Sequence, residues 1–242
     1  MTQSRYRLLV VSPHLDDAVL SCGMLLAANP SAVVCTVFTA PPRENMLTDW
    51  DRQSGFDDAL QAMQARKKED IHALQILGAQ PAHLPFCDAQ YRLTPSHESL
   101  VDALEQTLDE HKPETVMIPL GLFHSDHTLV SDACLAVMPG MRRVRFLAYE
   151  DVPYRHMEDL VPRRIAELTK RGYMLGVPDD LDTAATCGTA QEERLKREAI
   201  AAYASQLRAF GPEGEAALYS PEKYWLLQRF ENKLKPGGTS FA

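Results

Sequence analysis

The sequence lacks several patterns that would assign it to a large class of proteins. No stretch approaches the ~20 consecutive apolar residues that a membrane-spanning helix requires. Basic residues are not in excess, because the formal net charge is −8. An acidic balance disfavours nucleic acid and anionic membrane as partners, since both bind clusters of Lys and Arg. The sequence also shows no internal repeat, low-complexity tract or heptad pattern, so it indicates no particular oligomeric state.

Cysteine motifs are absent as well. No two of the five cysteines have the Cys-x-x-Cys spacing of a zinc or redox site, and their number is odd. The apolar run near the N-terminus is too short for the core of a signal peptide. We therefore expect reduced thiols and a cytoplasmic protein. The cysteines are Cys22, Cys35, Cys87, Cys134 and Cys187.

The length and composition are sufficient for a substantial core. A chain of 242 residues that is 45% hydrophobic can form one large α/β domain without disulfides. We expect a single domain over residues 1–242, with a flexible tail from about residue 235 because of the Pro-Gly-Gly-Thr-Ser sequence there.

Strand-like and helix-like segments alternate along the chain. This alternation implies right-handed βαβ units, and therefore an α/β fold with a mostly parallel sheet. A polar stretch over 41–55 predicts a long loop. Apolar periodicity predicts strands over 6–11, 32–39, 83–86, 114–118 and 145–149, and helices over 16–28, 56–77, 96–111, 129–137, 160–171 and 191–207. Residues 221–229 fit a strand or a helix, and the Tyr-Trp-Leu-Leu run at 224–227 favours a strand.

Two clusters of His and Asp stand directly after predicted strands. The first contains His14, Asp16 and Asp17, and the second contains His124 and His127 with an aspartate between them. Open α/β sheets bind their ligands beyond the carboxyl ends of the strands. We therefore interpret the two clusters as halves of one metal site.

The residue types suit zinc. A catalytic zinc ion takes three protein ligands and keeps one position for water. The three-residue spacing of His14 and Asp17 can direct both side chains at one point, and His127 supplies a third ligand. Fe²⁺ or another divalent ion is a possible substitute for Zn²⁺ in such a site.

The remaining members of the clusters are suited to proton transfer. Asp16 is the candidate general base for a water molecule whose pKa the metal lowers to ~7. His124 is the candidate to stabilise an oxyanion or protonate a leaving amine, and Asp126 to hold its imidazole in one tautomer. Taken singly, an Asp-Asp pair is more typical of a helix cap and a His-x-x-His pair of surface imidazoles. Their shared strand-end position favours the site.

At these residues the chain resembles the LmbE-like, or PIG-L, family of zinc-dependent de-N-acetylases. That family shows an Ala/Pro-His-Pro-Asp-Asp-Glu motif and a later His-Pro-Asp-His motif, which correspond here to residues 13–18 and 124–127. The resemblance covers roughly the first 150 residues. It implies a Rossmann-like three-layer fold and a hydrolase that removes an N-acyl group, most often N-acetyl, from an amino sugar or related conjugate. Its partner would be a small N-acylated molecule such as a glycoside.

The resemblance also implies pocket residues. Arg66 corresponds to an arginine that contacts substrate hydroxyls in some members, and Asp88 to a further pocket residue. The alternative for Arg66 is a solvated helix residue paired with Asp70. Glu150 and Asp151, which follow another predicted strand, either line the pocket or are solvated loop charges.

The chain departs from the family pattern at three positions. Ala18 replaces a glutamate, and Leu15 and Ser125 replace prolines. All ligands and acid/base groups remain, so we expect catalysis. Two alternatives stay open: an amidase acting on a non-sugar amide, such as a thiol conjugate or an acylated secondary metabolite, and a non-catalytic sugar- or nucleotide-binding protein with the same fold.

Overall fold

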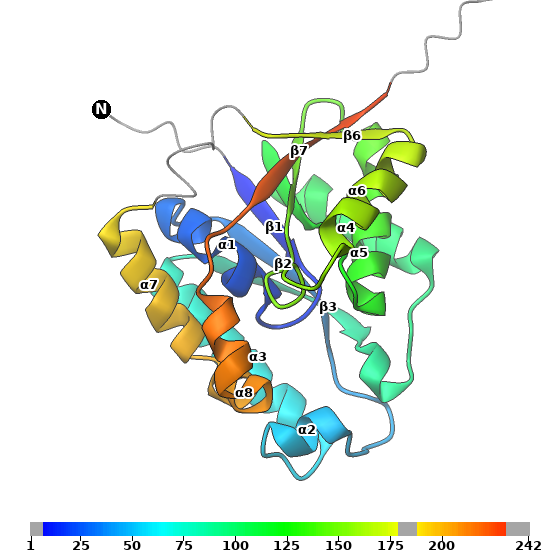
Figure 1. Cartoon of the computed structure of the whole chain (residues 1–242). Coiled ribbons are helices and arrows are strands. Elements are labelled where there is room, and N and C mark those ends of the chain that lie inside the picture. Colours follow the sequence, from blue (N-terminus) through cyan, green and yellow to red (C-terminus); the bar gives the residue numbers. More distant parts are fainter. Residues whose placement is uncertain (1–6, 179–187, 231–242) are drawn as a thin grey trace, which may run out of the picture.

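A seven-stranded sheet forms the centre of the computed structural model, which describes residues 7–178 and 188–230 (Figure 1). The tail expected from about residue 235 lies outside the described residues. The strands are β1 (Leu8–Ser12), β2 (Val33–Ala40), β3 (Gln80–Cys87), β4 (Thr115–Pro119), β5 (Arg145–Tyr149), β6 (Tyr173–Gly176) and β7 (Tyr224–Arg229).

The strand order is β3-β2-β1-β4-β5-β7-β6. The first five strands are parallel, whereas β7 runs antiparallel to both of its neighbours. The expected α/β fold with a mostly parallel sheet is thereby confirmed. Strand β6 was not predicted, because it has four residues at the sheet edge and Met174 within it is 44% exposed, so it lacks a buried apolar run.

Helices cover both faces of the sheet (Figure 1). On one face lie α1, α3, α7 and α8, and on the other lie α4, α5 and α6. The helices are α1 (Asp17–Ala28), α2 (Asp49–Gln53), α3 (Ala59–Leu77), α4 (His97–His111), α5 (Ser125–Val137), α6 (Leu160–Lys170), α7 (Ala190–Ala201) and α8 (Ala204–Leu218), with short 3₁₀ helices η1 (Ala89–Tyr91) and η2 (Met138–Gly140).

Apart from shifts of up to three residues at the ends of other elements, three predicted segments differ from the structure. Helix α2 lies inside the predicted loop over 41–55, and its five residues are too few to show an apolar period. Helix α5 begins at Ser125 rather than at residue 129, because its first turn is polar and was not counted as helix. The helix predicted over 191–207 is two helices, since the backbone of Tyr203 is not helical (φ −84°, ψ 51°).

The central strands separate two hydrophobic cores. Along β1, Leu8 and Val10 pack into one core, while Leu9 and Val11 pack into the other. Side chains alternate between the two faces of a strand, so a strand covered on both sides is apolar at every position. This explains the continuous apolar runs that mark β1 and β4 in the sequence.

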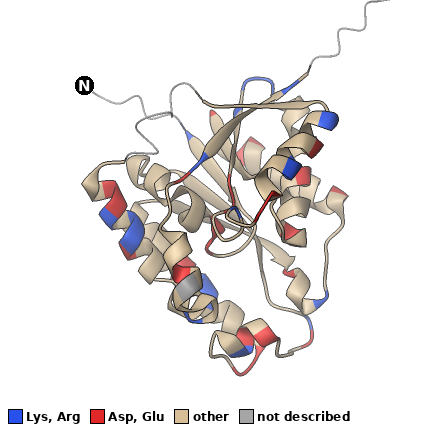
Figure 2. Ribbon diagram, viewed as in Figure 1, with Lys and Arg blue, Asp and Glu red and all other residues tan. Residues whose placement is uncertain are grey.

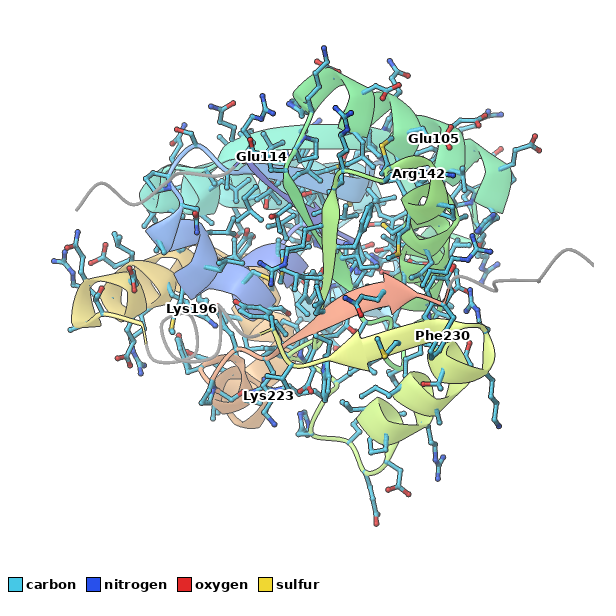
Figure 3. The ribbon with its side chains drawn as sticks, turned by 90° about the horizontal axis from the view of Figure 1, so that it is seen from above. Glu105, Glu114, Arg142, Lys196, Lys223 and Phe230 are labelled. Atoms are coloured by element: carbon cyan, nitrogen blue, oxygen red, sulfur yellow. The ribbon has the colours of Figure 1, made fainter. Side chains whose placement is uncertain are left out.

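Helix α1 is interrupted and held by distant residues. Cys22 departs from helical geometry (φ −135°), and the Glu222 carboxylate accepts the freed N–H of Met24 at 2.8 Å. Lys196 of α7 lies 2.7 Å from the same carboxylate and packs beside α1, where a Cβ on Gly23 would be 2.7 Å from its Cγ (Figure 3). The buried ion pair of Lys196 and Glu222 therefore holds in place the helix that begins at Asp17.

Acidic and basic side chains interleave along α7 (Figure 2), as Arg197 and Glu193, 2.9 Å apart, illustrate. Such i,i+4 pairs are typical of a solvent-exposed helix face. Among the described residues, no helix has the length and apolar character needed to cross a bilayer.

Candidate metal centre

The two acidic and histidine clusters meet at the carboxyl ends of β1 and β4. These strands are neighbours in the sheet, but the chain continues from β1 to β2 on one side and from β4 to β5 on the other. The loops that follow them therefore diverge and leave a crevice, which is where α/β folds bind ligands. The structure thus brings together residues that lie over a hundred positions apart in the sequence.

Two histidine rings of these clusters converge on one carboxylate oxygen of Asp17. Oδ2 of Asp17 is 3.1 Å from Nδ1 of His14 and 3.2 Å from Nε2 of His127. The ligand atoms of the three residues all lie within 4.8 Å of one another. Two imidazole nitrogens and a charged oxygen form a donor set that suits Zn²⁺ and other divalent transition metals.

The fully buried His127 ring has one nitrogen without a hydrogen bond. Its Nδ1 lies 2.6 Å from Oδ1 of Asp151, whereas Nε2 makes no hydrogen bond. Burial lowers the pKa of His127, but the charges of Asp17 and Asp151 outweigh burial and raise it to about 9. A buried nitrogen that faces a carboxylate without a hydrogen bond is the expected arrangement for a metal ligand, so the residues fit the ion.

Asp151 also holds the loop after β4. Its Oδ2 accepts the N–H groups of Gly121 at 2.9 Å and Leu122 at 3.0 Å, and its side chain is fully buried. Gly121 adopts φ +86°, and a Cβ there would lie 2.8 Å from Cβ of Ser131. Asp151 is therefore neither a solvated loop charge nor part of the cavity lining. Sequence reasoning placed it near the site but missed its contact with His127.

A second group of possible ligands shares His14. Its Nε2 is 3.2 Å from Oδ2 of Asp126, and His124 completes this group. Oδ1 of Asp126 also has no hydrogen bond. The set with Asp17 is better supported, because His127 in that set is fully buried and held by a carboxylate on its other nitrogen.

Asp16 presents its carboxyl group to the crevice. It occupies the N-cap position of α1, but its side chain makes no capping hydrogen bond. The residue is 6% exposed and lines the cavity described below. Burial and the charge of Asp17 raise the pKa of Asp16 to about 7. Asp16 therefore does not serve as a side-chain helix cap, which was the alternative for the Asp-Asp pair.

His124 is the residue that caps a helix. Its Nδ1 accepts the backbone N–H of Asp126 at 3.2 Å, so a neutral ring carries its proton on Nε2. Burial and the neighbouring His14 lower the pKa of His124. The Asp126 carboxylate, expected to hold this ring, lies 3.9 Å from Nδ1 of His124, which is an ion-pair distance and not a hydrogen bond, and the backbone N–H of Asp126 sets the tautomer. The carboxylate instead accepts the N–H of Ala89 at 3.1 Å and faces His14.

Arg66 is buried and lines the cavity. Its Nη2 lies 3.2 Å from Oδ1 of Asp51, and its Nε has no hydrogen bond. The alternative pairing with Asp70 is wrong, because Asp70 accepts from Tyr203 Oη at 2.9 Å and lies 2.7 Å from Nε2 of His83. The partner Asp51 escaped sequence reasoning because its segment was expected to be a loop.

Asp88 also faces the cavity. Its Oδ2 lies 3.7 Å from Nε2 of His14, and its carboxylate accepts the backbone and side-chain N–H groups of Gln90 at 2.9 and 2.8 Å. The cavity has a volume of about 270 Å³. Its polar lining consists of His14, Asp16, Asp17, Arg66, Asp88, Gln90, His124 and Gln206, and its apolar and aromatic lining consists of Leu15, Phe38, Trp50, Met63, Pro153, Tyr154 and Phe210.

Comparison with known proteins identifies related sequences and structures. The family model "PIG-L: GlcNAc-PI de-N-acetylase" matches residues 9–138, which is more than half of the chain. The 2'-N-acetylparomamine deacetylase of Streptomyces fradiae is 34% identical over 180 residues, which are 65% of this chain and 61% of that protein. The match therefore spans less than two thirds of that relative.

The folds of several solved structures match that of this protein over nearly the whole chain. A triple mutant of the teicoplanin deacetylase Orf2 superposes with a TM-score of 0.75 at 26% identity, covering 94% of this chain and all of that one. The A40926 pseudoaglycone deacetylase Dbv21 gives a TM-score of 0.70 at 26% identity, covering 95% of this chain and all of that one. A zinc-inhibited form of Orf2 gives 0.74 at 24% identity, with the same coverage as the triple mutant.

Proposed function

This chain belongs to the PIG-L family of de-N-acetylases, and on that premise we propose that it is a metal-dependent hydrolase that removes an N-acetyl group from an amino sugar carried by a glycoside. The observation that carries the proposal is the convergence of His14 and His127 on Asp17, together with Asp16, which lines the same cavity as His14 and Asp17. The names of the relatives, which are a 2'-N-acetylparomamine deacetylase, a deacetylase of the teicoplanin biosynthetic pathway and an A40926 pseudoaglycone deacetylase, support this substrate class.

His14, Asp17 and His127 would hold the ion, and we propose zinc, with Fe²⁺ as the substitute. When bound, such an ion polarises an acyl carbonyl and lowers the pKa of a water molecule to ~7. The support for this assignment is the donor set itself and the buried Nε2 of His127 that has no hydrogen bond. Asp151 fixes the His127 ring so that Nε2 faces Asp17.

Asp16 acts as the general base. Its carboxyl group is free of capping hydrogen bonds and stands in the cavity beside Asp17. It accepts a proton from the water molecule that attacks the acyl carbon, and it returns this proton to the amide nitrogen as the C–N bond breaks, so that the amine and acetate leave. A positioned general acid or base typically increases the reaction rate by about 10²- to 10⁴-fold.

His124 stabilises the oxyanion that forms on the acyl oxygen. Because its Nδ1 accepts a backbone N–H, the Nε2–H of the ring is available as a donor. A developing negative charge accepts such a hydrogen bond more strongly than the ground-state carbonyl does. Arg66 and Asp88, with Gln90, supply the polar groups that bind sugar hydroxyls from the side of the cavity.

The test combines metal analysis with a substrate panel. We expect about one divalent ion per chain and release of acetate from N-acetylglucosamine glycosides or N-acetylated aminoglycosides. Zinc should be titrated from below stoichiometry, because one related structure is described as a zinc-inhibited form. His124→Ala serves as the matched control, since it should keep the ion and lose turnover. If the metal-loaded protein releases no carboxylic acid from any member of the panel, the proposal is wrong.

A further inference from the structure

We propose that Trp50, Phe210 and Met63 form an apolar subsite that binds an aryl or alkyl group on the amine side of the scissile amide, such as the aglycone of the substrate glycoside. This inference rests on the proposed function and specifies its substrate class. All three side chains line the same cavity as Asp16 and His124. An N-acetyl group offers one methyl group to such a surface, so the apolar lining exceeds what the acetyl group alone requires.

The two aromatic rings form a continuous wall. The ring centroids of Trp50 and Phe210 are 5.4 Å apart, and their planes meet at 77°. This edge-to-face arrangement is a favourable geometry for aromatic pairs. Both residues are half-buried, so each ring keeps surface available to a ligand. Their helices, α2 and α8, lie side by side (Figure 1).

Buried polar contacts hold α2 in place. The residue after Trp50 is Asp51, whose fully buried carboxylate receives Arg66 Nη2 at 3.2 Å and Tyr91 Oη at 3.0 Å. Thr48 caps the same helix and donates to Gln90 at 2.9 Å. A helix of five residues would not be stable alone, so these contacts determine where Trp50 stands.

Hydrogen bonds connect helix α8 both to the end of α2 and to the loop after β1 that contains Asp16. Arg208 donates to the backbone oxygen of Ser54 at 2.6 Å, and Gln206 donates to that of Leu15 at 3.2 Å. Phe210 stands on the same turns, immediately before the kink at Gly211. The aromatic wall is therefore preorganised relative to Asp16, and preorganisation reduces the entropic cost of binding.

The lining combines polar side chains with apolar and aromatic ones. Arg66, Asp88 and Gln90 can hydrogen-bond hydroxyl groups, whereas Trp50 and Phe210 cannot satisfy a hydroxyl on their ring faces. This division matches a substrate with a polar sugar and an apolar substituent. In a hydrophobic pocket, one extra or missing methylene group changes the preference between two ligands by about 10- to 200-fold.

A binding experiment tests the subsite without catalysis. Trp225→Phe leaves Trp50 as the only tryptophan, because the chain has two, and Trp225 does not line the cavity. Phenyl β-D-glucopyranoside has no amide and serves as the probe. We expect a saturable change of Trp50 fluorescence in this variant, which methyl β-D-glucopyranoside does not produce and which Phe210→Ala abolishes. An absence of saturable binding would contradict the proposal even if the protein hydrolyses amides.

A kinetic experiment identifies the occupant. Wild type should show a KM about tenfold lower for the phenyl than for the methyl glycoside of N-acetylglucosamine, and Trp50→Ala should remove most of this ratio. Trp50→Phe should restore it, whereas Trp225→Phe should never disturb it. If Trp50→Ala raises KM equally for both glycosides, the aromatic wall stacks on the sugar alone and the proposal fails. It also fails if the substitution changes only the preference between N-acetyl and N-hexanoyl substrates, because the wall would then bind the acyl group. If no amide is hydrolysed, the fluorescence result still decides the subsite.

Discussion

The turn after β1 and the turn after β4 occupy equivalent places at the carboxyl ends of neighbouring strands, but their side chains are supported differently. His14, with a side chain that is 19% exposed, is held by Asp17 three residues later and faces Asp126. His127 is fully buried and is held by Asp151 from beyond β5. One ligand therefore depends on its own loop, and the other depends on a neighbouring strand.

The helix caps differ in the same way. Asp16 occupies the cap position of α1 with its carboxyl group free, whereas His124 uses its ring to cap α5. The comparison shows that a cap residue can either satisfy the helix or remain available to substrate. In the turn after β4, Nδ1 of His124 satisfies the helix, whereas Nε2 of the same ring remains available to substrate.

The largest effects are expected from removing the ligands. His14→Ala and His127→Ala should each abolish stoichiometric metal binding and acetate release, because each removes one of three ligands. The two variants should differ in stability. His127→Ala leaves Asp151 buried without its partner and should lower the free energy of unfolding by about 3 kcal/mol. His14→Ala should lower it by less than about 1 kcal/mol.

Urea denaturation of both variants as metal-free proteins measures this difference. Metal-free wild type is the reference, so that loss of the ion does not contribute to it. Equal losses of stability would show that the two histidines are supported alike.

Asp16→Asn should have the next largest effect. It removes the proton acceptor but leaves all three ligands, so kcat should fall by about 10²- to 10⁴-fold with metal content unchanged. Steady-state acetate release together with metal analysis checks this. A variant that retained the wild-type rate would exclude Asp16 as the general base.

His124→Ala should lower kcat by about 10²- to 10³-fold, as the loss of one oxyanion donor usually does. Its ring also caps α5, so a small loss of stability should accompany the loss of rate. His124→Asn offers a shorter donor and cap and should recover part of both. Thermal melts and kcat on the same samples separate the two roles, and loss of the metal would contradict this assignment.

The smallest expected effect is that of Asp151→Asn. The substitution keeps the size of the side chain but removes the charge beside His127, and such changes typically weaken metal affinity by about 10- to 100-fold. Competition with a chromogenic chelator measures the affinity without catalysis. The loop after β4 should remain in place, because the amide oxygen can still accept from Gly121 and Leu122. An unchanged affinity would show that His127 needs no support from β5.

Local patterns of the sequence were sufficient for much of this site. The apolar runs of β1 and β4 predicted the strand ends, and the spacing of His14 and Asp17 within one turn predicted a candidate ligand pair. The pairings of Arg66 with Asp51 and of Asp70 with Tyr203 were not accessible in this way. Each joins residues on different elements, and one partner lies in a segment without apolar periodicity.

The sequence by itself determined the order of most strands and helices, though not α2 or β6, and the identity of the candidate ligands. These features depend on residue type and on the periodicity of neighbouring positions. Only the tertiary structure decided which carboxylate supports His127, which side chain caps α5 and which aromatic rings line the cavity with Asp16. Those contacts join residues that are distant along the chain, and packing of the helices on the twisted sheet brings them within hydrogen-bonding or van der Waals distance.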